Sequence, residues 1–200
     1  MFRKFVVFIV GLYMRCRFKI DLVNYERFEK IKTGCILAPN HISAWETVMM
    51  PALSKKVMHM MAKEEIFKNK FVAWFLKEMK VFPIARKKND LGAIKTCVKL
   101  LKDGKSICMF PEGTRSKDKT LDFKTGVSMI AHSAKVPVIP VGIVAENDFK
   151  FRSKVHIVYG EPIYFTDYYD KKINKEDLVN MTEKVKNGVI KAIKSVEKEL

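Results

Sequence analysis

Cys35-Ile36-Leu37-Ala38-Pro39-Asn40-His41-Ile42-Ser43-Ala44-Trp45-Glu46 is an apolar run that passes directly into a polar segment. A short continuous apolar run is typical of a buried strand, and the loops after such strands carry the sites of many α/β proteins. The same order returns downstream, where Ile107-Cys108-Met109 precedes Phe110-Pro111-Glu112-Gly113-Thr114-Arg115-Ser116. We therefore expect both polar segments to leave buried strands of an α/β scaffold.

Apolar runs of strand length alternate with helical patterns along most of the chain. The expected strands are 35–38, 57–61, 81–85, 106–110, 138–144 and 155–159. The expected helices are 45–53, 64–79, 90–101, 125–134 and 172–199. This alternation predicts a single layered α/β domain over residues 20–200, with a largely parallel or mixed central sheet flanked by helices.

The composition is that of a globular, strongly basic protein. Hydrophobic residues make up 48% of the 200 residues, and 38 Lys and Arg against 22 Asp and Glu give a formal charge of +16. This hydrophobic content excludes a disordered chain. The positive excess attracts polyanions, which include nucleic acid, anionic lipid headgroups, phosphorylated metabolites and acidic carrier proteins. Charge alone does not choose among these partners.

The first 19 residues contain an apolar run, 5–14, between cations. The flanking cations are Arg3, Lys4, Arg15, Arg17 and Lys19. A helix of this length spans about 15 Å, half of a bilayer's hydrocarbon core, and no small-residue cleavage site follows it. We expect residues 1–19 to form a helix lying in the membrane interface, with the cations on anionic headgroups. The alternative is a helix docked on the domain's own core.

A second segment, the expected helix 64–79, mixes aromatic and basic residues. It carries Phe71 and Trp74 close to Lys68, Lys70 and Lys77. Part of its apolar face belongs to the core. Trp beside lysines also suits the headgroup level of a membrane, so partial membrane contact stays open.

The cysteines and the other histidines give no clear chemistry. Cys16, Cys35, Cys97 and Cys108 are scattered without a Cys-x-x-Cys pair, so we expect reduced thiols in a cytosolic setting. Cys108 is either a nucleophile or a core residue, and its apolar strand favours the core. His59, His132 and His156 lack acidic or Cys partners at ligand spacing, so we assign no metal. Neither a Gly-x-Gly-x-x-Gly motif nor a P-loop occurs, which leaves nucleotide chemistry without support.

His41 and Glu46 are a candidate pair for general-base catalysis. A hydroxyl must lose its proton as it attacks, and histidine suits the role of base near neutral pH. A carboxylate on the other ring nitrogen fixes the tautomer and stabilises the imidazolium. If Glu46 opens a helix, its carboxylate can fold back toward His41. Asn40 and Ser43 are suited to capping that helix, although Ser43 is also a rival nucleophile.

Three cations follow or end expected strands, where they can meet an anion. They are Lys63, Arg86 and Arg115. Arg binds phosphate oxygens in a bidentate manner, and Lys acts as a point charge. Beside Arg115, Gly113 permits a tight turn and Thr114 supplies a hydroxyl. Such a set is suited to a phosphomonoester.

These segments, in this order, resemble the signatures of the glycerolipid acyltransferases, and most closely those of the 1-acylglycerol-3-phosphate acyltransferases. The family's main blocks are His-x4-Asp and Glu-Gly-Thr-Arg, and Glu46 stands where the family usually has aspartate. The further matching blocks are Ala62-Lys63-Glu64-Glu65, Val81-Phe82-Pro83-Ile84-Ala85-Arg86, Phe123-Lys124-Thr125-Gly126 and Val136-Pro137-Val138-Ile139-Pro140-Val141. Lys80 departs from a glycine that often precedes the second of these.

The resemblance implies a membrane-associated enzyme that transfers a fatty acyl group to the free 2-hydroxyl of lysophosphatidate, giving phosphatidate in phospholipid biosynthesis. His41 is then the general base and Glu46 its orienting group. The implied phosphate-binding residues are Lys63, Arg86, Glu112, Gly113, Thr114 and Arg115. Glu112 either hydrogen-bonds the substrate or holds Arg115, and we favour the second. No cofactor is implied; the co-substrate is an acyl thioester of acyl carrier protein or coenzyme A, used at the cytoplasmic face of a membrane by a peripheral or monotopic protein.

Two alternatives stay open at this point. The same reaction on glycerol 3-phosphate or another lysophospholipid fits the same residues. A non-catalytic basic protein that binds membrane or nucleic acid is a different class, in which Glu46 marks decay of the site. The intact His41 and the intact Glu112–Arg115 segment argue against decay. No RNA- or DNA-binding motif is present, so we expect no nucleic-acid partner.

Overall fold

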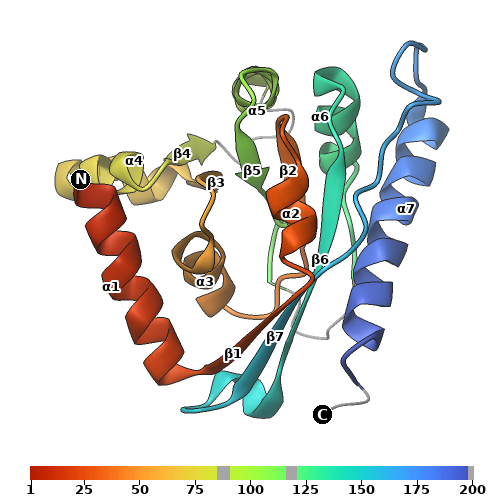
Figure 1. Ribbon diagram of the computed structural model, residues 1–200. Coiled ribbons are helices and arrows are strands. Elements are labelled where there is room, and N and C mark those ends of the chain that lie inside the picture. Colours follow the sequence, from red (N-terminus) through yellow and green to blue (C-terminus); the bar gives the residue numbers. More distant parts are fainter. Residues whose placement is uncertain (85–90, 116–120, 198–200) are drawn as a thin grey trace.

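The computed structural model describes residues 1–84, 91–115 and 121–197, whose arrangement is shown in Figure 1. They form one seven-stranded sheet with the order β1-β7-β6-β2-β5-β3-β4. The strands are β1 (Lys19–Val23), β2 (Cys35–Pro39), β3 (Met58–Lys63), β4 (Val81–Ile84), β5 (Ser106–Cys108), β6 (Val138–Ala145) and β7 (Lys154–Tyr159). The pairing of β6 with β7 is antiparallel and the other strand pairs are parallel. The expected single α/β domain with a mixed sheet is confirmed.

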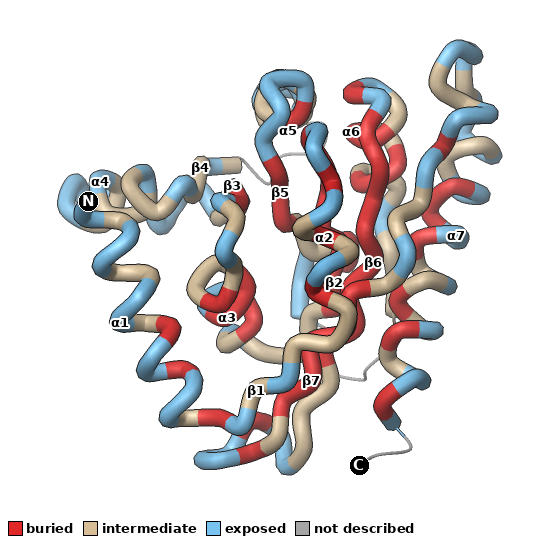
Figure 2. The backbone as a smooth tube through the Cα atoms, viewed as in Figure 1, coloured by how far each residue is buried: buried red, intermediate tan, exposed pale blue. Residues whose placement is uncertain are grey.

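Helices cover both faces of the sheet. They are α1 (Phe2–Arg17), α2 (Glu26–Lys30), α3 (Trp45–Leu53), η1 (Glu64–Lys68), α4 (Lys70–Glu78), α5 (Leu91–Lys102), α6 (Gly126–Ala134), η2 (Glu146–Phe149) and α7 (Lys175–Lys194). Successive side chains of a strand point to opposite faces. Accordingly, Cys35 and Leu37 of β2 join the core under α2 and α3, while Ile36 and Ala38 join the core under α5, α6 and α7. Both cores are visible as the buried segments in Figure 2.

Three local expectations need correction. The strand β1 and the short helix α2 were not expected. The expected helix 64–79 is wrong as one helix, because η1 and α4 are separate and Asn69 lies between them. The Asn69 side chain accepts hydrogen bonds from the amides of Phe71 and Val72, which is the geometry of a new helix start. The last residue of the expected strand 81–85 and the first of the expected helix 90–101 lie outside the described residues.

Lys80 stands where the family that the sequence resembles often has a glycine, and its φ is 65°. This is the left-handed region where glycine costs least. The turn before β4 therefore keeps a glycine-like conformation without a glycine.

The helix α1 is docked on the domain by one face and exposed on the other. Met14 is buried, and a Cβ on Gly11 would lie 2.9 Å from the backbone oxygen of Ala52, so α1 and α3 approach closely. On the other face Phe5 and Phe8 are mostly exposed. The docked helix that the sequence left open is thus present, together with an apolar face that the domain does not cover.

No helix of the described residues is long and apolar enough to span a membrane.

Candidate active site

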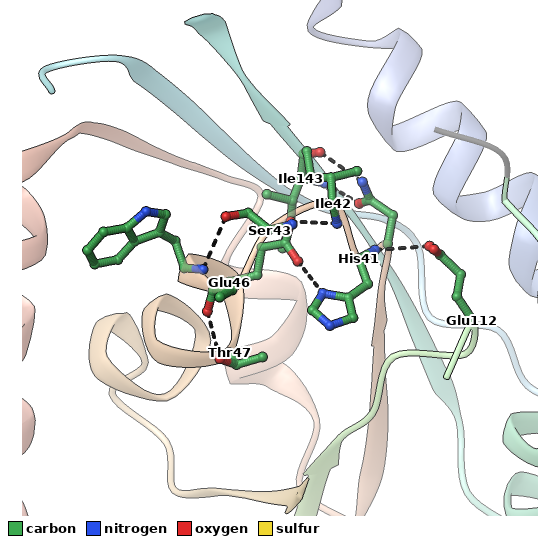
Figure 3. Close-up of polar contacts among 10 residues, drawn as sticks. His41, Ile42, Ser43, Glu46, Thr47, Glu112 and Ile143 are labelled. Atoms are coloured by element: carbon green, nitrogen blue, oxygen red, sulfur yellow. Dashed lines mark hydrogen bonds and ion pairs between the residues drawn. The ribbon is translucent and has the colours of Figure 1, made fainter. Parts of the chain in front are cut away.

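His41 follows the end of β2, and Glu46 lies in the first turn of α3 (Figure 3). The Nδ1 atom of His41 is 2.7 Å from Oε2 of Glu46. The Glu46 side chain is fully buried, while 14% of the His41 side chain is exposed. The carboxylate therefore holds one ring nitrogen from the protein side, as expected from the sequence, and leaves Nε2 as the nitrogen that a substrate can use.

The other oxygen of Glu46 organises the loop. Oε1 accepts hydrogen bonds from the backbone amides of Ile42 and Ser43, each at 2.8 Å. Ser43 Oγ in turn accepts from the Trp45 amide at the start of α3. Ser43 thus satisfies the Trp45 amide but is not the cap expected from the sequence, because the N-cap of α3 is Ala44 and has no side-chain cap hydrogen bond.

Burial raises the pKa of the Glu46 carboxyl, and its hydrogen bonds to His41 and to the loop amides oppose that rise. A carboxylate without these donors would be costly to bury. These donors favour the ionised carboxylate of Glu46, and a negative charge beside the imidazole would stabilise an imidazolium.

Asn40 fixes the start of the loop to the neighbouring strand. Its amide nitrogen donates to the Ile143 carbonyl at 3.0 Å, and its Oδ1 accepts from the Ile143 amide at 2.6 Å. Asn40 therefore continues the pairing of β2 with β6 through its side chain, and does not cap α3 as the sequence suggested.

Glu112 has a different partner from the one we favoured. Its Oε1 accepts a hydrogen bond from the His41 backbone amide at 2.9 Å, and the described residues contain no ion pair between Glu112 and Arg115. The register of the parallel pair β2–β5 accounts for this contact, because Leu37 faces Cys108 and each chain then runs four residues further. Burial raises the pKa of the Glu112 carboxyl, whose Oε2 has no hydrogen-bond partner among the described residues. Glu112 thus holds the backbone of the loop that carries His41.

A cleft of about 1040 Å³ opens at the C-terminal ends of β2, β3 and β5. It is lined by His41 and by four of the expected phosphate-binding residues, namely Lys63, Gly113, Thr114 and Arg115. Ligands of open α/β sheets bind at this edge. The Phe110 ring stacks on His41 with 4.2 Å between ring centroids. Arg86 lies outside the described residues.

The apolar part of the cleft comes from β3, β5 and the η1–α4 segment. Met60, Met61, Ile66, Leu76 and Met109 line it. The cleft therefore combines a basic end and an apolar wall around one histidine, a combination that suits an amphiphilic ligand.

Cys108 also lines the cleft, but its chemistry is that of a core residue. Complete burial raises the pKa of its thiol strongly, and the nearby Glu46 raises it further. A protonated thiol is a poor nucleophile. Among the described residues, no cluster of three or more His, Cys, Asp or Glu side chains is placed to hold a metal ion.

Replacing Glu46 by Gln should lower kcat by at least about 10², since an analogous carboxylate-to-amide change in a serine protease costs about 10⁴. If the amide oxygen keeps the bonds to Ile42 and Ser43, the NH₂ group must donate to Nδ1 of His41. The ring proton then moves to Nε2, the nitrogen that has to accept the substrate's proton. Steady-state kinetics measure this loss, and circular dichroism checks the fold.

Glu183→Gln is the matched control, because Glu183 is half-exposed on α7. Equal turnover of Glu46→Gln and wild type would mean that Glu46 only shapes the loop.

Comparison with known proteins places this site in a family. The model of the acyltransferase family matches residues 19–144. A 1-acyl-sn-glycerol-3-phosphate acyltransferase of Bacillus subtilis is 32% identical over 173 residues, which are 84% of this chain and 83% of the relative. One of Streptococcus pneumoniae is 31% identical over 192 residues, covering 92% and 71% of the two chains.

The fold comparison agrees. The crystal structure of the 1-acyl-sn-glycerophosphate acyltransferase PlsC from Thermotoga maritima superposes with a TM-score of 0.69 and 25% sequence identity, covering 94% of this chain and 80% of that one. The resemblance noted in the sequence is confirmed: the chain belongs to the acyltransferase family, and it is an enzyme of that family.

Proposed function

We propose that this enzyme transfers a fatty acyl group from an acyl thioester to the free 2-hydroxyl of lysophosphatidate. The names of the relatives in Bacillus subtilis and Streptococcus pneumoniae support this acceptor. The observation that carries the proposal is the position of His41, which is bonded to the buried Glu46 and lines the same cleft as Lys63 and Arg115. The donor is a thioester of acyl carrier protein or coenzyme A, both of which are acidic and complement a chain of net charge +16.

In the proposed reaction His41 is the general base. The acceptor hydroxyl gives its proton to Nε2 as its oxygen attacks the thioester carbonyl carbon. Glu46 stabilises the imidazolium that forms. The tetrahedral intermediate then collapses, the C–S bond breaks, and the leaving thiolate takes the proton back from His41. Since the substrate hydroxyl is the nucleophile, no acyl-enzyme is needed.

The basic end of the cleft is assigned to the headgroup phosphate. Lys63 ends β3, and Arg115 follows a turn in which Gly113 has a φ of 72°. Both residues line the cleft that contains His41, and Thr114 lines it as well. Arg86 is added from the sequence alone. Glu112 is assigned to holding the His41 backbone, the contact that its Oε1 makes.

An assay of free thiol release tests the function. Wild type supplied with an acyl thioester should release thiol with lysophosphatidate and much less with monoacylglycerol, which lacks the phosphate. Arg115→Ala should raise KM for lysophosphatidate at least tenfold, because a hydrogen bond to a charged group contributes about 1.5–3 kcal/mol. It should leave the use of monoacylglycerol unchanged.

Lys172→Ala, which removes an exposed cation before α7, is the control. If the wild-type enzyme prefers glycerol 3-phosphate, lysophosphatidate is not the acceptor and glycerol 3-phosphate takes its place. No transfer to any glycerol-based acceptor, or full activity of His41→Ala, would contradict the mechanism.

We also propose that the enzyme works at an anionic membrane surface. The α1–α4 face, defined here by Phe2, Phe5, Phe8, Phe71 and Trp74, exposes large apolar side chains, with Phe8 67% and Phe71 72% exposed. The rings of Phe2 and Trp74 are 5.2 Å apart, so α1 and α4 form one surface, although they are distant in the sequence (Figure 1). Arg3 and Lys4 lie on α1, Lys70 and Lys77 lie on α4, and Lys68 ends the preceding η1; these cations can meet anionic headgroups. Arg17 is not part of this set, because its guanidinium stacks on rings of the domain.

Tryptophan fluorescence can test the α1–α4 face, since the chain has 2 Trp residues. In a Trp45→Phe variant, the emission of Trp74 should shift to shorter wavelength when vesicles with phosphatidylglycerol are added, and high salt should reduce the shift. Combining Phe5→Ser with Phe8→Ser should weaken vesicle binding at least tenfold, since each buried Phe contributes about 1.5–3 kcal/mol.

Val179→Ser changes an exposed apolar residue on α7 and should bind vesicles as wild type does. Vesicle binding that is unaffected by salt and by the Phe substitutions would contradict the assignment of the membrane contact to the α1–α4 face.

A further inference from the structure

The connection from β6 to β7 contains an unusual run of left-handed residues. Asn147, Asp148 and Phe149 have φ values of 48°, 50° and 60°. Asn and Asp tolerate this conformation, but a bulky residue such as Phe rarely adopts it. Backbone strain of this kind persists where the surroundings hold it, and it concentrates at functional sites.

This turn forms part of the catalytic cleft. Asp148 and Phe149 line the cleft together with His41. Phe149 is buried and packs edge-on against the buried ring of Phe18, which follows α1. The position of the cleft wall therefore depends on what fixes Phe149.

Arg17, the last residue of α1, makes the contacts that fix it. Its Nη2 donates to the Phe149 carbonyl at 3.4 Å, and its own carbonyl accepts from the Arg152 amide at 2.8 Å. The turn is thus held from both sides by one residue that is far away in the sequence.

The guanidinium of Arg17 also contacts the start of the catalytic helix. It lies 4.8 Å from the ring centre of Phe18, 5.7 Å from that of Trp45 and 5.3 Å from that of Phe151. Trp45 directly precedes Glu46. The Phe18 ring packs against the Trp45 ring, with 5.4 Å between ring centres. Stacking of a guanidinium on aromatic faces is strongest where water is excluded. Nη1 of Arg17 is buried with no hydrogen-bond partner among the described residues, so the rings and the Phe149 carbonyl are its main support.

We infer that Arg17 is a positioning residue for the acceptor, because it holds the turn at 147–149 that forms one wall of the cleft. The inference rests on the proposed function, since it assigns that wall to the binding of lysophosphatidate. It also gives α1 a second role: the helix whose outer face meets the membrane builds part of the active site at its other end.

The test compares Arg17→Met with wild type in detergent micelles, where vesicle docking plays no part. Met keeps the apolar stem and removes the guanidinium. Loss of the stacking contacts should raise KM for lysophosphatidate about tenfold. The value of kcat should fall less than about threefold, since His41 and Glu46 are untouched. Hydrogen–deuterium exchange of the segment 146–153 should become at least about tenfold faster, while α7 exchanges as before.

Arg17→Lys is the second variant, and it keeps the charge but loses the planar fork. Its KM and exchange rate should fall between those of wild type and Arg17→Met. Lys150→Met removes an exposed cation from the same turn and should match wild type in KM.

Unchanged exchange of 146–153 in both Arg17 variants would overturn the inference, whatever their activity. A kcat loss without a change in KM would also overturn it. If wild type fails to use lysophosphatidate, the proposed function fails, and the exchange rates still decide whether Arg17 holds the turn.

Discussion

The active site of this acyltransferase depends on one buried carboxylate. Glu46 binds Nδ1 of His41 with one oxygen and two loop amides with the other. The same group therefore sets the direction of the imidazole and the path of the loop, and in the proposed reaction it would also support an imidazolium electrostatically. Its side chain is fully buried, which makes these three hydrogen bonds obligatory, because an unpaired carboxylate would be expensive to bury. Glutamate makes these contacts at the position where the family usually has aspartate.

The sheet brings the remaining groups to this carboxylate. The strands β2, β5 and β3 are parallel neighbours, so the segments that follow them leave the sheet at the same edge. That edge receives His41 after β2, Glu112 and Arg115 after β5, and Lys63 at the end of β3. A cationic end and an apolar wall thus meet at one histidine without any of these segments being close in the sequence.

Local features were predictable from the sequence, and long-range ones were not. The apolar run before His41 predicts a buried strand. The short spacing from His41 to Glu46 predicts a carboxylate that folds back toward the imidazole, because Glu46 lies in the first turn of the helix that follows the loop. The contact of Glu112 with the His41 amide requires the register of β2 and β5, which no local pattern contains. The strand β1 was missed because its residues, Lys19–Val23, do not form a continuous apolar run, and its partner β7 is far along the chain. The sequence left α1 as either a membrane helix or a docked helix; its two faces allow both.

The position of the proton on the His41 ring decides whether Glu46 orients the base. The chain has 4 histidines, so ¹⁵N chemical shifts of labelled imidazoles are readily assigned with a His41→Gln variant. Under conditions where the His41 ring carries a single proton, we expect that proton on Nδ1, shared with Glu46, and an unprotonated Nε2 that can accept the proton of the acceptor hydroxyl. A ring that carries its proton on Nε2 in the wild-type enzyme would contradict the account, because the nitrogen facing the cleft would then be unable to act as the base.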